Sequence, residues 1–122
     1  MHSSFIRFWL PVILYCTAIF VQSSFPSPLP LSGFALSDKL VHALAYAILG
    51  VLICRAANTV ERWHRQWGAL FVIGVCAATL YGITDEFHQS FVIGRSAEIA
   101  DAMANFAGSV LGCGVYLGFF RQ

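Results

Sequence analysis

Ionisable and amide side chains in this sequence are concentrated in three short stretches between long apolar runs. A charged side chain inside a bilayer costs about 3 kcal/mol on insertion scales unless it faces a cavity or a partner, so its default interpretation is functional. We therefore expect the three stretches to form one polar site. Its predicted binding residues are Asp38, Lys39, His42, Tyr46, Asp85, Glu86, Gln89, Arg95, Asp101 and Asn105.

The first stretch places an acid, an imidazole and a phenol on one side of a helix. Asp38, His42 and Tyr46 recur at intervals of four, and Lys39 precedes His42 by three. An acid in a first helical turn is favoured by the helix dipole. That effect explains Asp38 alone and leaves His42 and Tyr46, deeper on the same face, unexplained.

The second stretch ends a helix with two adjacent acids, Asp85 and Glu86, followed by Gln89. Acids at a helix C-terminus are disfavoured by the helix dipole and by each other. Arg95, Lys39, a metal ion or a retained proton must therefore compensate them. This pair is the strongest single indication of a functional site.

The third stretch places Glu98, Asp101 and Asn105 on one face of the last helix, at spacings of three and four. Asn105 suits either a ligand contact or a hydrogen bond between helices. Two small-xxx-small patterns follow it and predict close helix approach: Gly108 with Gly112, and Gly114 with Gly118.

The composition indicates a membrane protein of a single domain. Of the 122 residues, 58% are hydrophobic and 11% are charged, against about 25% charged in a typical soluble domain. The net charge of +1 and the lack of a basic patch exclude nucleic-acid binding. The four cysteines lie singly in apolar runs, so we interpret them as buried packing residues without disulfides.

Four apolar segments are each close to the roughly 20 residues that a helix needs to cross about 30 Å of hydrocarbon. We predict an all-α integral membrane four-helix bundle, a single transmembrane domain covering residues 1–122. The first segment also resembles a secretory signal, but it is long enough to span, so we expect it to be retained. The predicted helices are about residues 5–24, 38–56, 67–87 and 98–120.

The basic residues of the short loops predict the orientation. Arg55, Arg62 and Arg65 lie between the second and third helices, Arg7 near the first, and Arg121 after the fourth. Cytoplasmic loops carry an excess of Lys and Arg. We therefore expect both termini in the cytoplasm, a multi-pass location in the inner membrane, and all three polar stretches on the extracytoplasmic side.

Convergence on one surface would make an acidic site, because five acids accompany only two bases there. Our leading hypothesis is a pocket that binds a cell-envelope component, such as a lipid-linked or cell-wall precursor headgroup. A structural alternative is a salt-bridged clasp in which Lys39 and Arg95 neutralise the acids and tie the helix ends together. A proton-relaying transporter is a further alternative.

An enzyme is the alternative from another class. In an intramembrane hydrolase or transferase, Asp85, Glu86, Asp101 and His42 would hold a divalent metal or act as general acid and base. The candidate metal ligands are His42, Glu86 and Asp101. No G-x-S-x-G nucleophile motif supports this alternative.

The order and spacing of these motifs resemble the signature of the VanZ-like family over roughly residues 37–112. The resemblance implies a small bacterial integral membrane protein, in a family whose namesake is associated with resistance to the glycopeptide antibiotic teicoplanin. It implies no reaction, cofactor or oligomeric state. The motifs are Asp38-Lys39-x-x-His42-x-x-x-Tyr46, Asp85-Glu86-x-x-Gln89, Arg95 and Asp101-x-x-x-Asn105-x-x-Gly108.

Overall fold

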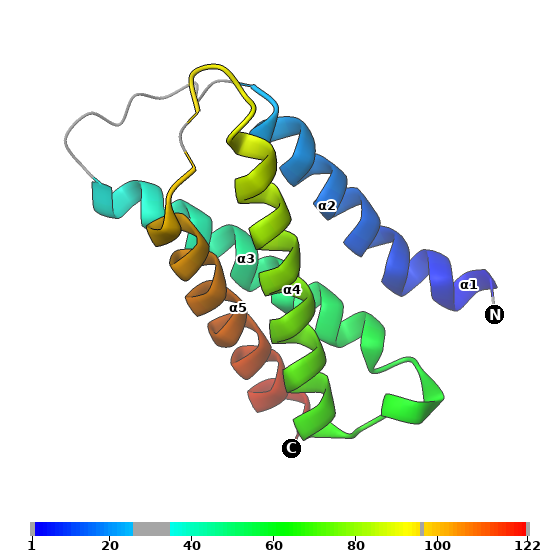
Figure 1. The fold of residues 1–122 in the computed structure, drawn as a ribbon. Helices are drawn as coiled ribbons and strands as arrows, with labels where there is room; N and C mark the ends of the chain where they lie inside the picture. The colour runs from blue at the N-terminus through cyan, green and yellow to red at the C-terminus, as the bar shows by residue number, and fades with distance from the viewer. Residues whose placement is uncertain (1, 26–34, 96, 122) are drawn as a thin grey trace.

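The computed structural model describes residues 2–25, 35–95 and 97–121, without the side chains of residues 2 and 35–38. The described residues are mostly helical (Figure 1). The first rod is continuous and consists of α1, His2–Ser4, the π-helical turn η1, Phe5–Trp9, and α2, Leu10–Ser23. The remaining elements are α3, Ala35–Ala57, the 3-10 turn η2, Glu61–Trp63, α4, Trp67–Gln89, and α5, Ile99–Phe120.

Four of these helical stretches are long and apolar enough to cross a membrane, which confirms the predicted all-α fold with four spanning helices. At 1.5 Å per residue, α4 and α5 are each about 33 to 35 Å long. Two helices extend further than predicted at the end that carries the polar stretches. The spans are Phe5–Ser23, Lys39–Ala57, Trp67–Gln89 and Ile99–Phe120.

The closest packing in the molecule is between α3 and α5, which begin at the same end of the bundle (Figure 1). A Cβ on Gly108 would lie 2.0 Å from Ala43 O, and a Cβ on Gly112 would lie 2.0 Å from Ala47 O. Only glycine permits this approach of the two backbones. We call these four residues, Ala43, Ala47, Gly108 and Gly112, the glycine seam.

The second glycine pattern does not pack as predicted. A Cβ on Gly114 or Gly118 would meet no described atom within 4 Å. Small residues four apart allow a close approach only on the side of the helix that faces a neighbour. Both glycines lie on the open side of α5, which the spacing alone does not reveal.

Below the polar end, the core is built from side chains of α3, α4 and α5. Tyr46, Leu49 and Ala78 form one buried cluster, and Cys54 and Cys113 belong to another. The prediction of buried cysteines is therefore correct for these two. It is wrong for the other two, because Cys16 is half-buried and Cys76 is exposed.

The helix α2 packs against α3 and α4 more loosely than α3, α4 and α5 pack against one another. Two tyrosines attach it by hydrogen bonds to backbone carbonyls. Tyr15 Oη donates to Ala45 O at 2.7 Å, and Tyr81 Oη donates to Cys16 O. These two bonds hold the middle of the first helix, while the tightest packing of the bundle is between α3 and α5.

Candidate functional site

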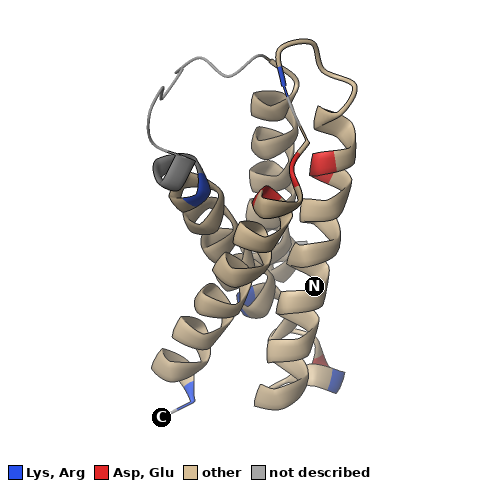
Figure 2. Ribbon diagram, turned by 60° about the vertical axis from the view of Figure 1, so that its left-hand side comes forward, with Lys and Arg blue, Asp and Glu red and all other residues tan. Residues whose placement is uncertain are grey.

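Buried polar side chains of three helices meet at the end of the bundle where α3 and α5 begin and α4 ends. Figure 2 shows acidic residues, in red, close together on neighbouring segments at the end of the bundle away from the C-terminus. Glu86, Asp101 and Asn105 are only 7%, 4% and 1% exposed. We call the set the polar cluster: Lys39, His42, Glu86, Glu98, Asp101 and Asn105.

Helix geometry explains how the sequence assembles this set. Lys39 and His42 are three residues apart on α3, and Asp101 and Asn105 are four apart on α5, so each pair shares a helix face. Since α3 and α5 start at the same end, the two pairs lie at the same height. The close approach permitted by the glycine seam brings them into contact.

Lys39 joins α3 to the start of α5 through two carboxylates. Its Nζ donates to Glu98 Oε2 at 2.7 Å and to Asp101 Oδ1. The Glu98 side chain is 51% exposed, that of Lys39 24%, and that of Asp101 6%. Glu98 was expected on the helical face, but it caps α5 with extended backbone, φ −125° and ψ 136°. The two ion pairs of Lys39 therefore link the half-exposed Glu98 to the buried Asp101.

His42 is oriented by Asn105. Its Nδ1 lies 3.2 Å from Asn105 Oδ1. An amide oxygen only accepts hydrogen bonds, so Nδ1 donates, and in the neutral ring the lone pair lies on Nε2. That Nε2 is 3.7 Å from Asp101 Oδ2, so the imidazole presents its basic nitrogen toward a carboxylate.

Glu86 completes the cluster from α4. Its Oε2 accepts the backbone N–H of Glu98 at 3.3 Å, while its Oε1 has no hydrogen-bond partner among the described residues. The same is true of Asn105 Nδ2. A buried polar group without a partner costs about 1 to 3 kcal/mol, so each of these atoms would be stabilised by a polar ligand that reaches it.

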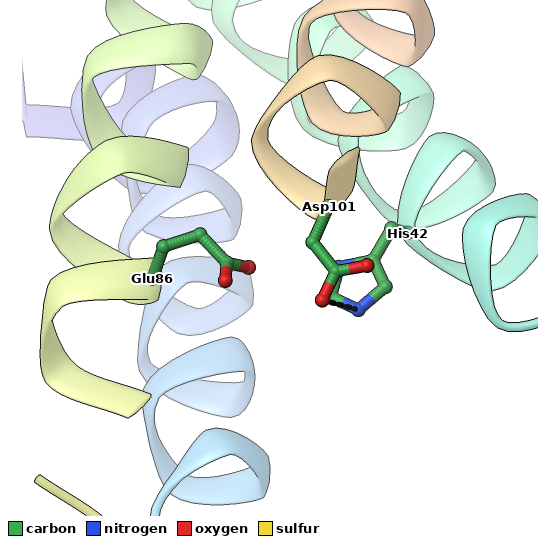
Figure 3. A group of neighbouring side chains, drawn as sticks. All are labelled: His42, Glu86 and Asp101. Atoms are coloured by element: carbon green, nitrogen blue, oxygen red, sulfur yellow. Dashed lines mark ion pairs between the residues drawn. The ribbon is translucent and has the colours of Figure 1, made fainter. Parts of the chain in front are cut away.

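Three side chains of the cluster could hold a cation. One nitrogen of His42 and one carboxylate oxygen each of Glu86 and Asp101 all lie within 4.8 Å of one another. Figure 3 shows the Glu86 side chain pointing across from α4 toward the other two. These are the three metal-ligand candidates of the sequence, and together they could bind a divalent ion or exchange protons.

Asp85 and Glu86, although adjacent, face different surroundings. Asp85 Oδ2 accepts hydrogen bonds from Tyr46 Oη at 3.3 Å and Gln89 Nε2 at 3.4 Å. Gln89 Nε2 also lies 3.3 Å from Ser23 Oγ, which is buried at the end of α2. Sequence reasoning missed Ser23, whose only signal is its position two residues after the apolar run that ends at Val21. Asp85, Tyr46, Gln89 and Ser23 thus form one hydrogen-bonded group, and Glu86 belongs to the neighbouring polar cluster.

Arg95 binds backbone at the end of α2. Its Nε donates to Phe25 O at 2.8 Å and its Nη2 to Gln22 O at 3.0 Å. The sequence offered Arg95 as a partner of the Asp85–Glu86 pair, but these bonds tie the α4–α5 loop to the first helix instead. The side chain of Asp38, the remaining predicted site residue, lies outside the described part of the chain.

A shallow surface hollow lies at the opposite end of α5, away from the polar cluster. It is lined by Gly114, Leu117, Gly118 and Arg121. No residue of the polar cluster contributes to it. The polar cluster is instead a set of packed side chains whose exposed edge is formed by Glu98 and Lys39.

The sequence model of the VanZ/LLP1 family matches residues 8–121. The chain belongs to the VanZ/LLP1 family. This match includes every residue of the polar cluster and confirms the resemblance carried by the motifs. Comparison with curated proteins and with solved structures finds no significant match to either. Membership of the VanZ/LLP1 family together with four candidate spans identifies a multi-pass membrane protein.

Proposed function

We propose that the polar cluster binds the headgroup of a cell-envelope lipid. The supporting observation is that two deeply buried polar atoms, Glu86 Oε1 and Asn105 Nδ2, have no partner among the described residues. Buried polar groups in native proteins are paired in roughly 90% of cases or more. One acceptor and one donor left unpaired in the same cluster favour a polar ligand that binds both.

The height of the cluster favours a lipid over a soluble ligand. Asp101 is the third residue of α5, and Glu86 is the fourth residue from the end of α4. Because helices of this length just cross the hydrocarbon, their ends lie near the headgroups, so we expect the cluster to lie at that boundary. A lipid that diffuses in the plane of the membrane carries its headgroup at this height.

The charge of the cluster restricts the headgroup. Three carboxylates, those of Glu86, Glu98 and Asp101, accompany the single ammonium of Lys39. An anionic headgroup alone would be repelled by this excess of acids. The ligand must supply hydrogen-bond donors, as sugars, amides and amines do, or bring a positive charge with it. A lipid-linked cell-wall precursor combines these features.

The basic residues of the other end favour an extracytoplasmic site. Arg55, Arg62 and Arg65 precede α4, and Arg121 follows α5, which is the distribution of cytoplasmic segments. A green fluorescent protein fused to the C-terminus should fluoresce, and alkaline phosphatase fused there should stay inactive. The reverse pattern would place the cluster on the cytoplasmic side.

Native mass spectrometry of the protein purified in mild detergent tests the binding function. We expect the wild type to retain an adduct of lipid mass, and Asp101→Asn to lose it. Glu61→Gln removes an exposed acid of η2 at the other end and should keep the adduct. An empty wild type, or the same adduct on Asp101→Asn, would contradict the proposal.

A role in teicoplanin resistance follows if the ligand is a cell-wall precursor. We expect expression of the wild type in a susceptible host to raise the teicoplanin concentration that stops growth. Asp101→Asn should abolish the effect while the protein is still inserted in the membrane. Equal resistance with both forms would separate the phenotype from the polar cluster.

A further inference from the structure

We infer that His42, Glu86 and Asp101 bind one divalent metal cation. This inference deepens the proposed function, and it rests on that function only for the ligand that the cation would hold. The three ligand atoms lie within 4.8 Å of one another, so a point between them is at most about 2.8 Å from each. Bonds of about 2.0 to 2.6 Å to divalent cations require each ligand atom to move inward by at most about 0.8 Å.

Second contacts orient the ligands on α3 and α5. His42 Nδ1 donates to Asn105 Oδ1, which directs Nε2 toward the centre of the three residues. Asp101 receives Lys39 on Oδ1 and directs Oδ2 toward His42. Metal-binding histidines almost always donate their other ring N–H to an oxygen in this way, and metal-binding carboxylates are themselves hydrogen-bonded.

The same arrangement holds for the ligand on α4. The backbone N–H of Glu98 binds Glu86 Oε2 and leaves Oε1 without a described partner, while the carboxylate points toward His42 and Asp101 (Figure 3). Each of the three side chains thus has one atom held by a neighbouring group, and a second atom that is available to a cation between them.

The unpaired oxygen of Glu86 is independent evidence for a ligand. Glu86 is 7% exposed, and its Oε1 has no partner in the described part of the chain. Burial of a carboxylate without a counter-charge is far more costly than burial of a neutral polar group. A cation at the common centre would contact this oxygen and also neutralise part of the acidic excess.

The ligand types favour Mn²⁺ or Zn²⁺. Carboxylates suit Mg²⁺, Ca²⁺ and Mn²⁺, whereas imidazole suits Zn²⁺ and other transition metals. Two carboxylates and one imidazole thus select an ion that accepts both oxygen and nitrogen. With three protein ligands, the ion keeps open positions for water or for a phosphate oxygen of a headgroup, so a cation would allow an acidic site to hold an anionic lipid.

Metal binding can be measured on the full chain in detergent without added lipid. After dialysis against a chelator, we would titrate Mn²⁺ and follow its free signal by electron paramagnetic resonance, and count bound Zn²⁺ by elemental mass spectrometry. We expect about one ion per chain. Glu86→Gln should weaken binding by at least about tenfold, as loss of a ligand or its support does.

Asp85→Asn separates ligation from general charge. It removes the same charge one residue away, from a carboxylate whose oxygen faces Tyr46 and Gln89, so binding should change much less than in Glu86→Gln. Glu61→Gln at the other end should leave binding unchanged. Equal weakening by Asp85→Asn and Glu86→Gln, or a wild type without an ion, would overturn the inference.

A second variant and a second readout keep the two proposals distinct. His42→Gln should lose the ion as Glu86→Gln does, and thermal unfolding of each variant shows whether it is folded. A lipid adduct on a wild type that binds no ion would overturn the cation site and leave lipid binding intact. An ion bound without any lipid adduct would support the cation site and contradict lipid binding.

Discussion

The interface between α3 and α5 has two halves of opposite character. In the glycine seam, backbones touch and the residues carry no charge. In the polar cluster, about one turn away, the carboxylates of Glu86 and Asp101 are almost completely buried. Replacing a buried ion pair with apolar residues is often neutral or stabilising by about 1 to 4 kcal/mol. The seam therefore accounts for the pairing of the helices, and stability alone does not account for the cluster.

A methyl group in the glycine seam should have the largest effect on stability. In Gly108→Ala the new Cβ would meet Ala43 O at 2.0 Å, so the helices must separate. We expect a loss of about 3 kcal/mol or more in unfolding free energy, at or above the usual cost of overpacking. Thermal unfolding in detergent, followed by circular dichroism, measures it.

Gly114→Ala is the matched control for this change. It adds the same methyl group to the same helix at a position with no described atom within 4 Å. Because alanine has the higher helix propensity, stability should be unchanged or rise by up to about 1 kcal/mol. Equal losses from Gly108→Ala and Gly114→Ala would show that the seam is not the tight contact described here.

Removal of the inner acid of the polar cluster should have a moderate effect. In Asp101→Asn, Lys39 keeps its ion pair with Glu98, whose side chain is half-exposed. The loss should be about 1 to 2 kcal/mol, below the roughly 3 to 5 kcal/mol for breaking an enclosed pair, because Lys39 also reaches water. Chemical unfolding in detergent measures this change, and a loss as large as that of Gly108→Ala would favour a structural clasp.

Arg95→Ala should have a small and local effect. Its guanidinium donates to two carbonyls at the end of α2, and exposed hydrogen bonds of this kind contribute about 1 kcal/mol or less. We expect faster amide hydrogen exchange around Ser23 and Ser24, with the lipid adduct and the melting temperature nearly unchanged. Loss of the adduct would show that Arg95 belongs to the binding site.

The sequence was sufficient to predict the fold because the number of long apolar runs gives the number of spans. Successive spans run in opposite directions, so the start of the second, the end of the third and the start of the fourth lie at one end of the bundle. Four-residue spacing also identified the helix faces of His42 and Asp101. Spacing does not give helix rotation or depth. For that reason Gly114 was wrongly expected to pack against a neighbouring helix, and the different surroundings of Asp85 and Glu86 were not foreseen.

The contact made by Arg95 was also beyond sequence reasoning. Its partners are backbone carbonyls of residues Gln22 and Phe25, which carry no compositional signal. Glu98 was assigned to the helical face of α5 because it fits the spacing, yet the helix begins one residue later. Boundaries and backbone partners depend on the packing of distant segments, which periodicity does not contain.

The most direct test of the account combines binding and stability in Glu86→Gln. This change keeps the size of the side chain and removes the buried charge whose Oε1 has no described partner. A binding site predicts that the variant loses its lipid or metal adduct in native mass spectra, while its melting temperature stays equal to the wild type or rises. A variant that keeps the adduct but melts several degrees lower would show that the polar cluster is a structural clasp and contradict the account.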